Sequence, residues 1–239
     1  MEFTERGFPE PGEEYLRATD YFDYGHARVA AFTDAAVAGA SSDADKSIKL
    51  FYAIRDSIRY DPYQMRREAE HYRASYALTQ GASYCIPKAN LLVACARRVG
   101  IPAALGLADV TNHMCTERLL RVIGGTDLFP HHGYAALYID DAWVKAAPAF
   151  NIQLCDKFDV TPTEFDGRHD ALLQEFDKRG RRHMDYVADN GIWSDFPYER
   201  VHGDFVAFYP KTFFEDLARE RALNEAKAAR QFEDEKPLS

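Results

Sequence analysis

Residues 84–92 read Tyr84-Cys85-Ile86-Pro87-Lys88-Ala89-Asn90-Leu91-Leu92, which places a cysteine directly before a predicted helix. Pro87 suits the first helical position, and it biases Ile86 towards an extended backbone. The thiol of Cys85 would then lie beside the free N–H groups and the positive dipole end of the helix. These partial charges, together with Lys88, are expected to favour thiolate over thiol. The stretch therefore predicts a nucleophilic cysteine at the head of a helix.

Apolar periodicity extends this helix from Pro87 to Val99, and Gly100 ends it. The same criteria predict helices over residues 24–40, 45–59 and 116–123, a terminal helix over 213–232, a strand over 103–110, and two further strands over 132–139 and 143–150. Asp140-Asp141-Ala142 joins the last two strands into a predicted hairpin. Residues 152–209 mix short helical and loop signals, so the sequence makes no firm prediction there.

The composition favours one globular unit over residues 1–239. The chain is 46% hydrophobic, which is enough to bury a sizeable core. Its formal net charge of −9 gives no basic field for nucleic acid. Met1 to Pro11 are polar and acidic, unlike a signal peptide, and no apolar run has the length needed to cross a membrane. We therefore expect a soluble cytoplasmic protein with no membrane or nucleic-acid partner.

The cysteines and histidines do not have the spacing of a metal site. The chain has four cysteines, Cys85, Cys95, Cys115 and Cys155, which we expect to be free thiols in a reducing compartment. Cys95 falls on the inner face of its helix. His113 precedes Cys115 closely, but no Cys-x-x-Cys or His-Glu-x-x-His spacing accompanies the pair. We expect no metal and no organic cofactor.

Several fragments occur in an order that is known from one group of cysteine enzymes. They are Gly81-Ala82-Ser83-Tyr84-Cys85, the helix end Arg98-Val99-Gly100-Ile101-Pro102-Ala103, His132-Gly133-Tyr134 followed by Trp143, and the upstream stretch Leu50 to Tyr63. Together they resemble the transglutaminase-like superfamily, whose layout of Cys and His is papain-like. Each fragment alone is a weak signal, and the resemblance covers roughly residues 45–155.

The resemblance implies an α+β fold, in which the helix that carries the cysteine packs on an antiparallel sheet. The core would span about residues 45–155. A helical N-terminal part over residues 12–44 and a C-terminal extension over residues 156–239 would complete a single domain.

The resemblance also implies a chemistry for Cys85 and His132. The thiolate of Cys85 would attack a carboxamide in a peptide, a protein or a small amide, and His132 would act first as base and then as acid. An acyl-enzyme would form, and water or an amine would complete hydrolysis or acyl transfer. Backbone N–H groups at the helix start would form the oxyanion hole, and Gln80 could add a donor or be an ordinary loop residue.

The sequence departs from the family pattern at Ala147, where the family usually carries Asp before Pro. On an extended strand Ala147, Ala149 and Asn151 point the same way, so Asn151 could orient the imidazole of His132. Asn151 could equally be a turn residue at the end of the strand. The missing carboxylate leaves a second hypothesis open, namely a catalytically degenerate fold that serves as a binding or scaffolding module.

Two further predictions concern the neighbourhood of the pair. His131 should face the opposite side of its strand from His132, which makes it the less suitable base. Asp109 and His113 lie in a segment that could reach the cleft and bind substrate. A loop held by its own hydrogen bonds is the simpler interpretation of that segment.

Overall fold

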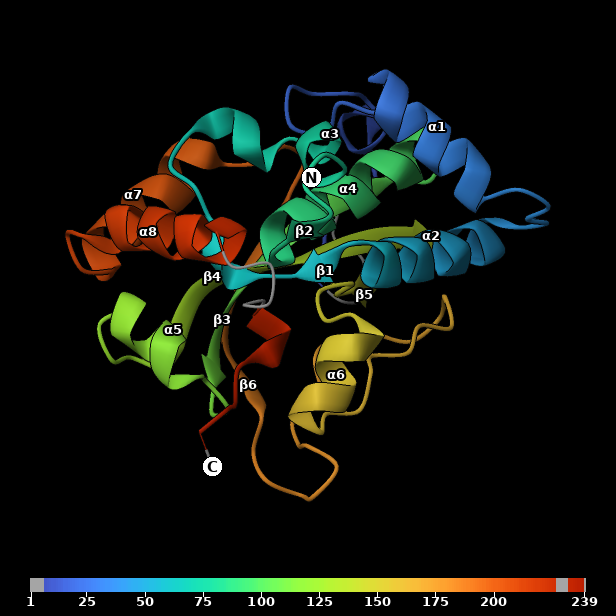
Figure 1. Ribbon diagram of the computed structural model, residues 1–239. Helices are drawn as coiled ribbons and strands as arrows, with labels where there is room; N and C mark the ends of the chain where they lie inside the picture. Colours follow the sequence, from blue (N-terminus) through green and yellow to red (C-terminus); the bar gives the residue numbers. More distant parts are fainter. Residues whose placement is uncertain (1–6, 227–231, 239) are drawn as a thin grey trace.

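A computed structural model describes residues 7–226 and 232–238 of the protein, and helices cover one face of a four-stranded antiparallel sheet in it (Figure 1). The strand order is β5-β4-β3-β6. The sheet consists of β3 (Ala103–Asn112), β4 (Leu128–Ile139), β5 (Ala142–Ala146) and β6 (Met184–Trp193). A separate two-stranded parallel sheet pairs β1 (Arg59–Tyr60) with β2 (Ala82–Ser83). The predicted α+β class with an antiparallel sheet is therefore confirmed.

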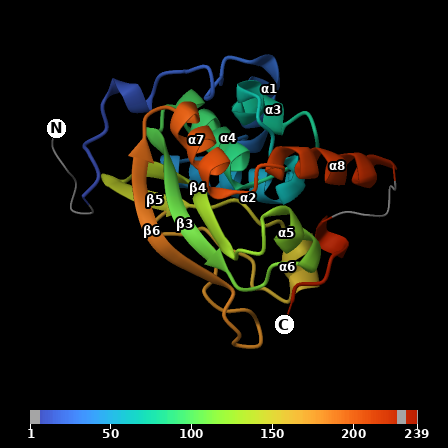
Figure 2. The same cartoon turned by 90° about the vertical axis from the view of Figure 1, so that its left-hand side faces the viewer.

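The helices of the described residues are α1 (Ala27–Ala36), α2 (Asp43–Ser57), α3 (Ala74–Ala77), α4 (Cys85–Arg98), α5 (Glu117–Val122), α6 (Ile152–Phe158), α7 (Tyr198–Phe208) and α8 (Phe213–Ala226). Short 3-10 turns are η1 (Glu13–Tyr15), η2 (Pro62–Gln64), η3 (Ala69–Tyr72) and η4 (Phe232–Asp234). Helix α4 packs on β3 and β4 on one side and on α1, α2 and α3 on the other (Figure 2). It is the central helix of the domain.

Helix α4 is buried all round, although its sequence includes polar and charged residues. Every side chain from Cys85 to Arg97 is buried. The polar ones bind backbone carbonyls of other segments: Asn90 donates to the carbonyl of Tyr72, and the Arg97 guanidinium donates to those of Ala103 and Ser194, among others. A buried polar group is tolerated when it is hydrogen-bonded in this way. These bonds fix α4 to its neighbours more specifically than apolar packing alone.

Glycine at position 133 lets the first turn of α4 approach strand β4 closely. A Cβ atom on Gly133 would lie 2.8 Å from the Cα atom of Ile86 and 3.1 Å from its backbone nitrogen. Both are backbone atoms, so the clash could not be relieved by rotating a side chain. The contact brings Cys85, at the head of α4, next to the part of β4 that carries His132.

The predicted hairpin of β4 and β5 is present, with Asp140 and Asp141 at its turn. Both residues have positive φ, 48° and 63°, as a tight two-residue hairpin turn requires. Strand β5 ends at Ala146, however, and not at the predicted residue 150. Pro148 lacks an N–H group for a ladder bond, and the N–H of Ala147 binds the carbonyl of Ala171.

The other predicted elements are found with shifted ends. The helices predicted over residues 24–40, 45–59 and 116–123 correspond to α1, α2 and α5, and the predicted strand over 103–110 to β3. The terminal helix, predicted over residues 213–232, spans Phe213–Ala226, and residues 227–231 lie outside the described residues. Strand β6 and helix α7 fall within residues 152–209, where the sequence signal was mixed.

The contact at Gly133 predicts a position-specific loss of stability. Gly133→Ala should lower the free energy of unfolding by about 1–3 kcal/mol, because the added methyl group overpacks the junction of α4 and β4. Urea denaturation followed by circular dichroism measures the change. Gly203→Ala in α7 is the matched control, because no atom lies within 4 Å of its added Cβ. Replacing a glycine in a helix with alanine raises the free energy of unfolding by up to about 1 kcal/mol. Equal stability of the two variants would refute the close-packing argument.

Candidate active site

Cys85 is the first residue of α4, and Tyr84 is its N-cap. The prediction that Ile86 is extended and Pro87 opens the helix is therefore wrong by two residues. Pro87 occupies the third helical position, where its missing N–H group would have had no intrahelical acceptor. The N–H of Lys88 makes the first bond of the turn, to the carbonyl of Tyr84. The predicted location of Cys85 at the head of a helix holds.

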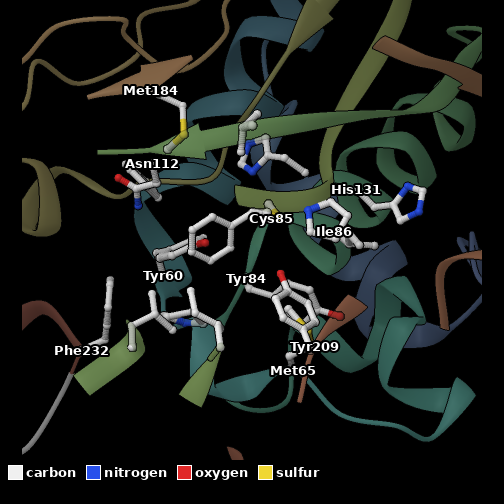
Figure 3. Close-up of a pocket in the computed structure, with 18 of the residues that line it drawn as sticks. Tyr60, Met65, Tyr84, Cys85, Ile86, Asn112, His131, Met184, Tyr209 and Phe232 are labelled. Carbon is white, nitrogen blue, oxygen red and sulfur yellow. The ribbon is translucent and has the colours of Figure 1, made fainter. Parts of the chain in front are cut away.

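Cys85 lines a cavity between the sheet and the C-terminal helices, and Figure 3 shows it at the centre of the lining residues. Its side chain is buried, with the whole residue 8% exposed. Burial raises the pKa of the Cys85 thiol to about 11. Hydrogen bonds from the backbone N–H groups of Gly133, Ile86 and Cys85 itself favour the thiolate, but they do not outweigh burial. At neutral pH the resting residue is therefore a thiol, and the predicted resting thiolate is wrong.

Lys88 does not contact this thiol. Its ammonium group is buried on another side of α4 and donates to the carbonyls of Arg55, Ile58 and Ala149. Desolvation lowers the pKa of Lys88 to about 7. Three donors meet three acceptors, so Lys88 holds α4 to the end of α2 and to the segment after β5. The prediction that Lys88 stabilises a Cys85 thiolate is wrong for this reason.

His132 lines the same cavity as Cys85, and it follows Pro130 and His131 on β4. The ring is buried, and its Nε2 atom has no hydrogen-bond partner among the described residues. Desolvation, and next the proximity of His183, lower the pKa of His132 to about 4. The imidazole is therefore neutral at pH 7. A neutral ring with a free nitrogen can accept a proton.

His131 also lines the cavity, but its ring contacts Phe205 of α7, whereas the ring of His132 contacts Tyr186 of β6. The φ of 59° at His131 breaks the regular alternation of the strand, and the pairing of β4 with β3 shifts register at this point. The carboxylate of Asp109 accepts the backbone N–H of His131, and Asp204 of α7 lies 2.7 Å from its Nε2. The imidazole with a carboxylate partner is thus His131, and not His132.

Asn151 does not reach the imidazole of His132. Its Oδ1 accepts the N–H of Tyr60, its Nδ2 donates to Gln153, and its backbone caps α6. The predicted alternation failed because β5 ends before residue 147. Asn151 is a buried structural residue at a turn, which was the second interpretation of the sequence. Ala147 packs in the apolar cluster of Tyr134 and Trp143, so no carboxylate occupies the usual family position.

His183 is a cavity residue that the sequence analysis missed. It is 1% exposed, its Nδ1 has no hydrogen-bond partner among the described residues, and burial lowers its pKa to about 4. It lies just before β6, whose pairing with β3 brings it near His132. No local motif surrounds His183. Only the position of β6 in the sheet could have indicated its role.

The remaining candidates lie outside this cavity. Gln80 is exposed and donates to Thr79, so it is not directed at Cys85. The ring of His113 is 2.9 Å from Asp185, and Asp109 holds the backbone of His131 and the amide of Asn190.

No group of three metal-binding side chains occurs within residues 7–226 and 232–238, and the four cysteines are free thiols. Among the described residues, no helix is long and apolar enough to cross a membrane.

Residues 30–148 match the transglutaminase-like superfamily. The chain carries a domain of this superfamily. The resemblance seen in the sequence fragments is therefore confirmed, and the transglutaminase-like domain has the fold of a group that includes thiol enzymes.

Among solved structures, a proposed cysteine protease from Cytophaga hutchinsonii is similar, with a TM-score of 0.42 and 16% sequence identity. The similarity covers 56% of this chain and 40% of the other, so this chain spans less than half of that protein. No curated protein matches the chain.

The neutral state of Cys85 predicts the pH dependence of its alkylation. Because burial raises its thiol pKa to about 11, the rate with iodoacetamide should be low at pH 6 and should rise about tenfold per pH unit up to pH 9. Peptide mass spectrometry after timed labelling gives the rate at Cys85, and Cys85→Ala identifies its peptide. Labelling that is already rapid and independent of pH between pH 5 and 8 would show a resting thiolate and contradict the argument.

Proposed function

We propose that the protein is a thiol enzyme that takes an acyl group from a carboxamide onto Cys85, with His132 as the base. The observation that carries the proposal is that Cys85 and His132, from different elements, line one cavity. The backbone N–H of Gly133, the residue after His132, favours the thiolate form of Cys85 and so lies near its sulfur. Membership of the transglutaminase-like superfamily supports the same pair.

The reaction would begin from a neutral thiol and a neutral imidazole. As the sulfur attacks the carbonyl carbon, the thiol proton moves to the free nitrogen of His132. The backbone N–H groups of Gly133 and Ile86, which already approach the sulfur, would stabilise the oxyanion. His132 then returns the proton to the amine as the C–N bond breaks, and water or a second amine releases the acyl group.

One feature favours a second candidate function, a transglutaminase-like fold that serves as a binding module. Ala147 stands where the family usually carries the carboxylate that orients the histidine, and the Nε2 atom of His132 has no partner among the described residues. The raised pKa of Cys85 fits this alternative as well as it fits general-base activation. Trapping an acyl-enzyme discriminates between the two.

The proposal predicts acylation at Cys85 that depends on His132. With p-nitrophenyl acetate as a reactive acyl donor, intact-protein mass spectrometry should detect one acetyl group, and peptide mapping should locate it on Cys85. Cys85→Ala should abolish the adduct. His132→Ala should lower the acylation rate at least about 100-fold, which is the usual contribution of a general base.

His131→Ala is the matched control, because His131 is the neighbouring cavity histidine. We expect its acylation rate to fall less than about tenfold. The opposite result would be an acylation rate that falls at least about 100-fold in His131→Ala and is unchanged in His132→Ala. In that case the base would be His131 with its partner Asp204. If no acyl group attached to Cys85 at any pH, the binding-module hypothesis would be favoured and the proposed function would fail.

A further inference from the structure

The walls of the cavity are apolar over most of their extent. Away from Cys85 they are formed by side chains that include Val110, Leu119, Ile123, Phe158, Leu217 and Phe232. Among the described residues that line the cavity, none is an Asp, Glu, Lys or Arg. The cavity contains about 830 Å³ of empty space, including the part open to solvent. Its lining therefore favours an uncharged group over a charged one.

The lining near Cys85 differs in polarity from the lining that the later helices supply. The thiol and two of the histidines lie where α4 meets β4, and Asn112 of β3 and three tyrosines add further polar groups to the lining. In contrast, α5, α6, α8 and η4 contribute only apolar side chains to it, namely Leu119, Phe158, Phe213, Leu217 and Phe232. Figure 3 shows Tyr60 beside Cys85, with Phe232 farther along the cavity. The rings of Tyr60 and Phe232 are 6.0 Å apart. An acyl group whose carbonyl is held at Cys85 would thus have its chain directed along the apolar walls.

This arrangement distinguishes between polar and apolar acyl groups. A peptide segment or a carboxamide chain would bring N–H and C=O groups that the side chains from α5, α6, α8 and η4 cannot pair, and burying these groups without partners is unfavourable. A hydrocarbon chain loses no hydrogen bond on entry and gains by leaving water. His132 and His183 do not add charge at neutral pH, because burial lowers the pKa of each to about 4.

Resting on the function proposed above, we propose that the acyl group accepted by Cys85 is an uncharged hydrocarbon chain, aliphatic or aryl-aliphatic. The S–C bond forms as the bond to the leaving amine breaks, and His132 carries the proton from the thiol to that amine. Water then attacks the thioester, the carboxylic acid is released, and the proton returns to the sulfur. The apolar walls select the acyl chain and take no part in these bond changes.

A series of p-nitrophenyl esters tests the proposal. Acetyl, butanoyl and heptanoyl esters are compared with the 3,6-dioxaheptanoyl ester, which has the chain length of heptanoyl but two ether oxygens. The acylation rate of Cys85 is divided by the rate of the same ester with hydroxide, which removes intrinsic differences in reactivity. Each buried methylene should raise the corrected rate about threefold to fourfold. The heptanoyl ester should therefore exceed both the acetyl and the dioxaheptanoyl ester at least about tenfold.

A pair of variants on α8 locates the effect. Leu217 is 1% exposed and lines the cavity, whereas Leu223, on the same helix, is 36% exposed and does not line it. Leu217→Asn should lower the ratio of heptanoyl to acetyl rates at least about threefold, and Leu223→Asn should leave it unchanged. The ratio is measured on folded protein, so a general loss of stability does not alter it.

The outcomes separate the two proposals. If no ester acylates Cys85, the proposed function fails. If the acetyl ester acylates Cys85 but the heptanoyl ester is no faster, or if the dioxaheptanoyl ester is equally fast, only the proposal of an apolar acyl group fails. An unchanged ratio in Leu217→Asn would likewise exclude the α8 wall as the binding surface of the chain.

Discussion

The close contact between the first turn of α4 and Gly133 of β4 is the constraint on which the site depends. The absence of a side chain at Gly133 lets backbone meet backbone, and this fixes where the head of the helix lies. Arg97 and Lys88 hold other parts of the helix through bonds to carbonyls. Helix α4 thus has little freedom to slide. The position of Cys85 relative to His132 follows from this packing and not from a direct bond between the two.

Burial has opposite effects on the two members of the pair. It raises the pKa of the thiol to about 11 and lowers that of the imidazole to about 4, because in each case the charged form loses its hydration. The resting site is therefore neutral. Charge would appear only during attack, when backbone N–H groups lie close to the developing negative charge. The same low polarity that keeps the pair neutral makes the adjoining cavity suitable for an apolar chain.

The sequence predicted the main features of the fold and the location of two residues of the candidate site. Three of these features are local patterns, which a sequence shows directly. They are the cysteine before a helix, the histidine on the first hairpin strand, and the Asp140-Asp141 turn. The α+β class followed from their order. The prediction that Asn151 continues the strand was wrong, because the end of β5 depends on Pro148 and on a hydrogen bond from Ala147 to Ala171.

Other parts of the site could not be predicted, because they depend on tertiary contacts. Lys88 resembles a charged group for the helix head, but it is directed towards carbonyls that distant segments supply. His131 adopts a positive φ that accompanies a shift in strand register, and its ring binds Asp204 of α7. His183 reaches the site only because β6 pairs with β3. None of these arrangements has a signature in the nearby sequence.

The most direct test of the account is a covalent cross-link within the site. The reagent 1,3-dibromoacetone has two reactive carbons separated by one carbonyl, so it joins a cysteine only to a nucleophile that lies very close. After reaction at Cys85, peptide mass spectrometry identifies the second attachment point. The account predicts a link from Cys85 to His132, and His132→Ala should remove it. A link from Cys85 to His131 or to His183 in the unaltered protein, with none to His132, would contradict it.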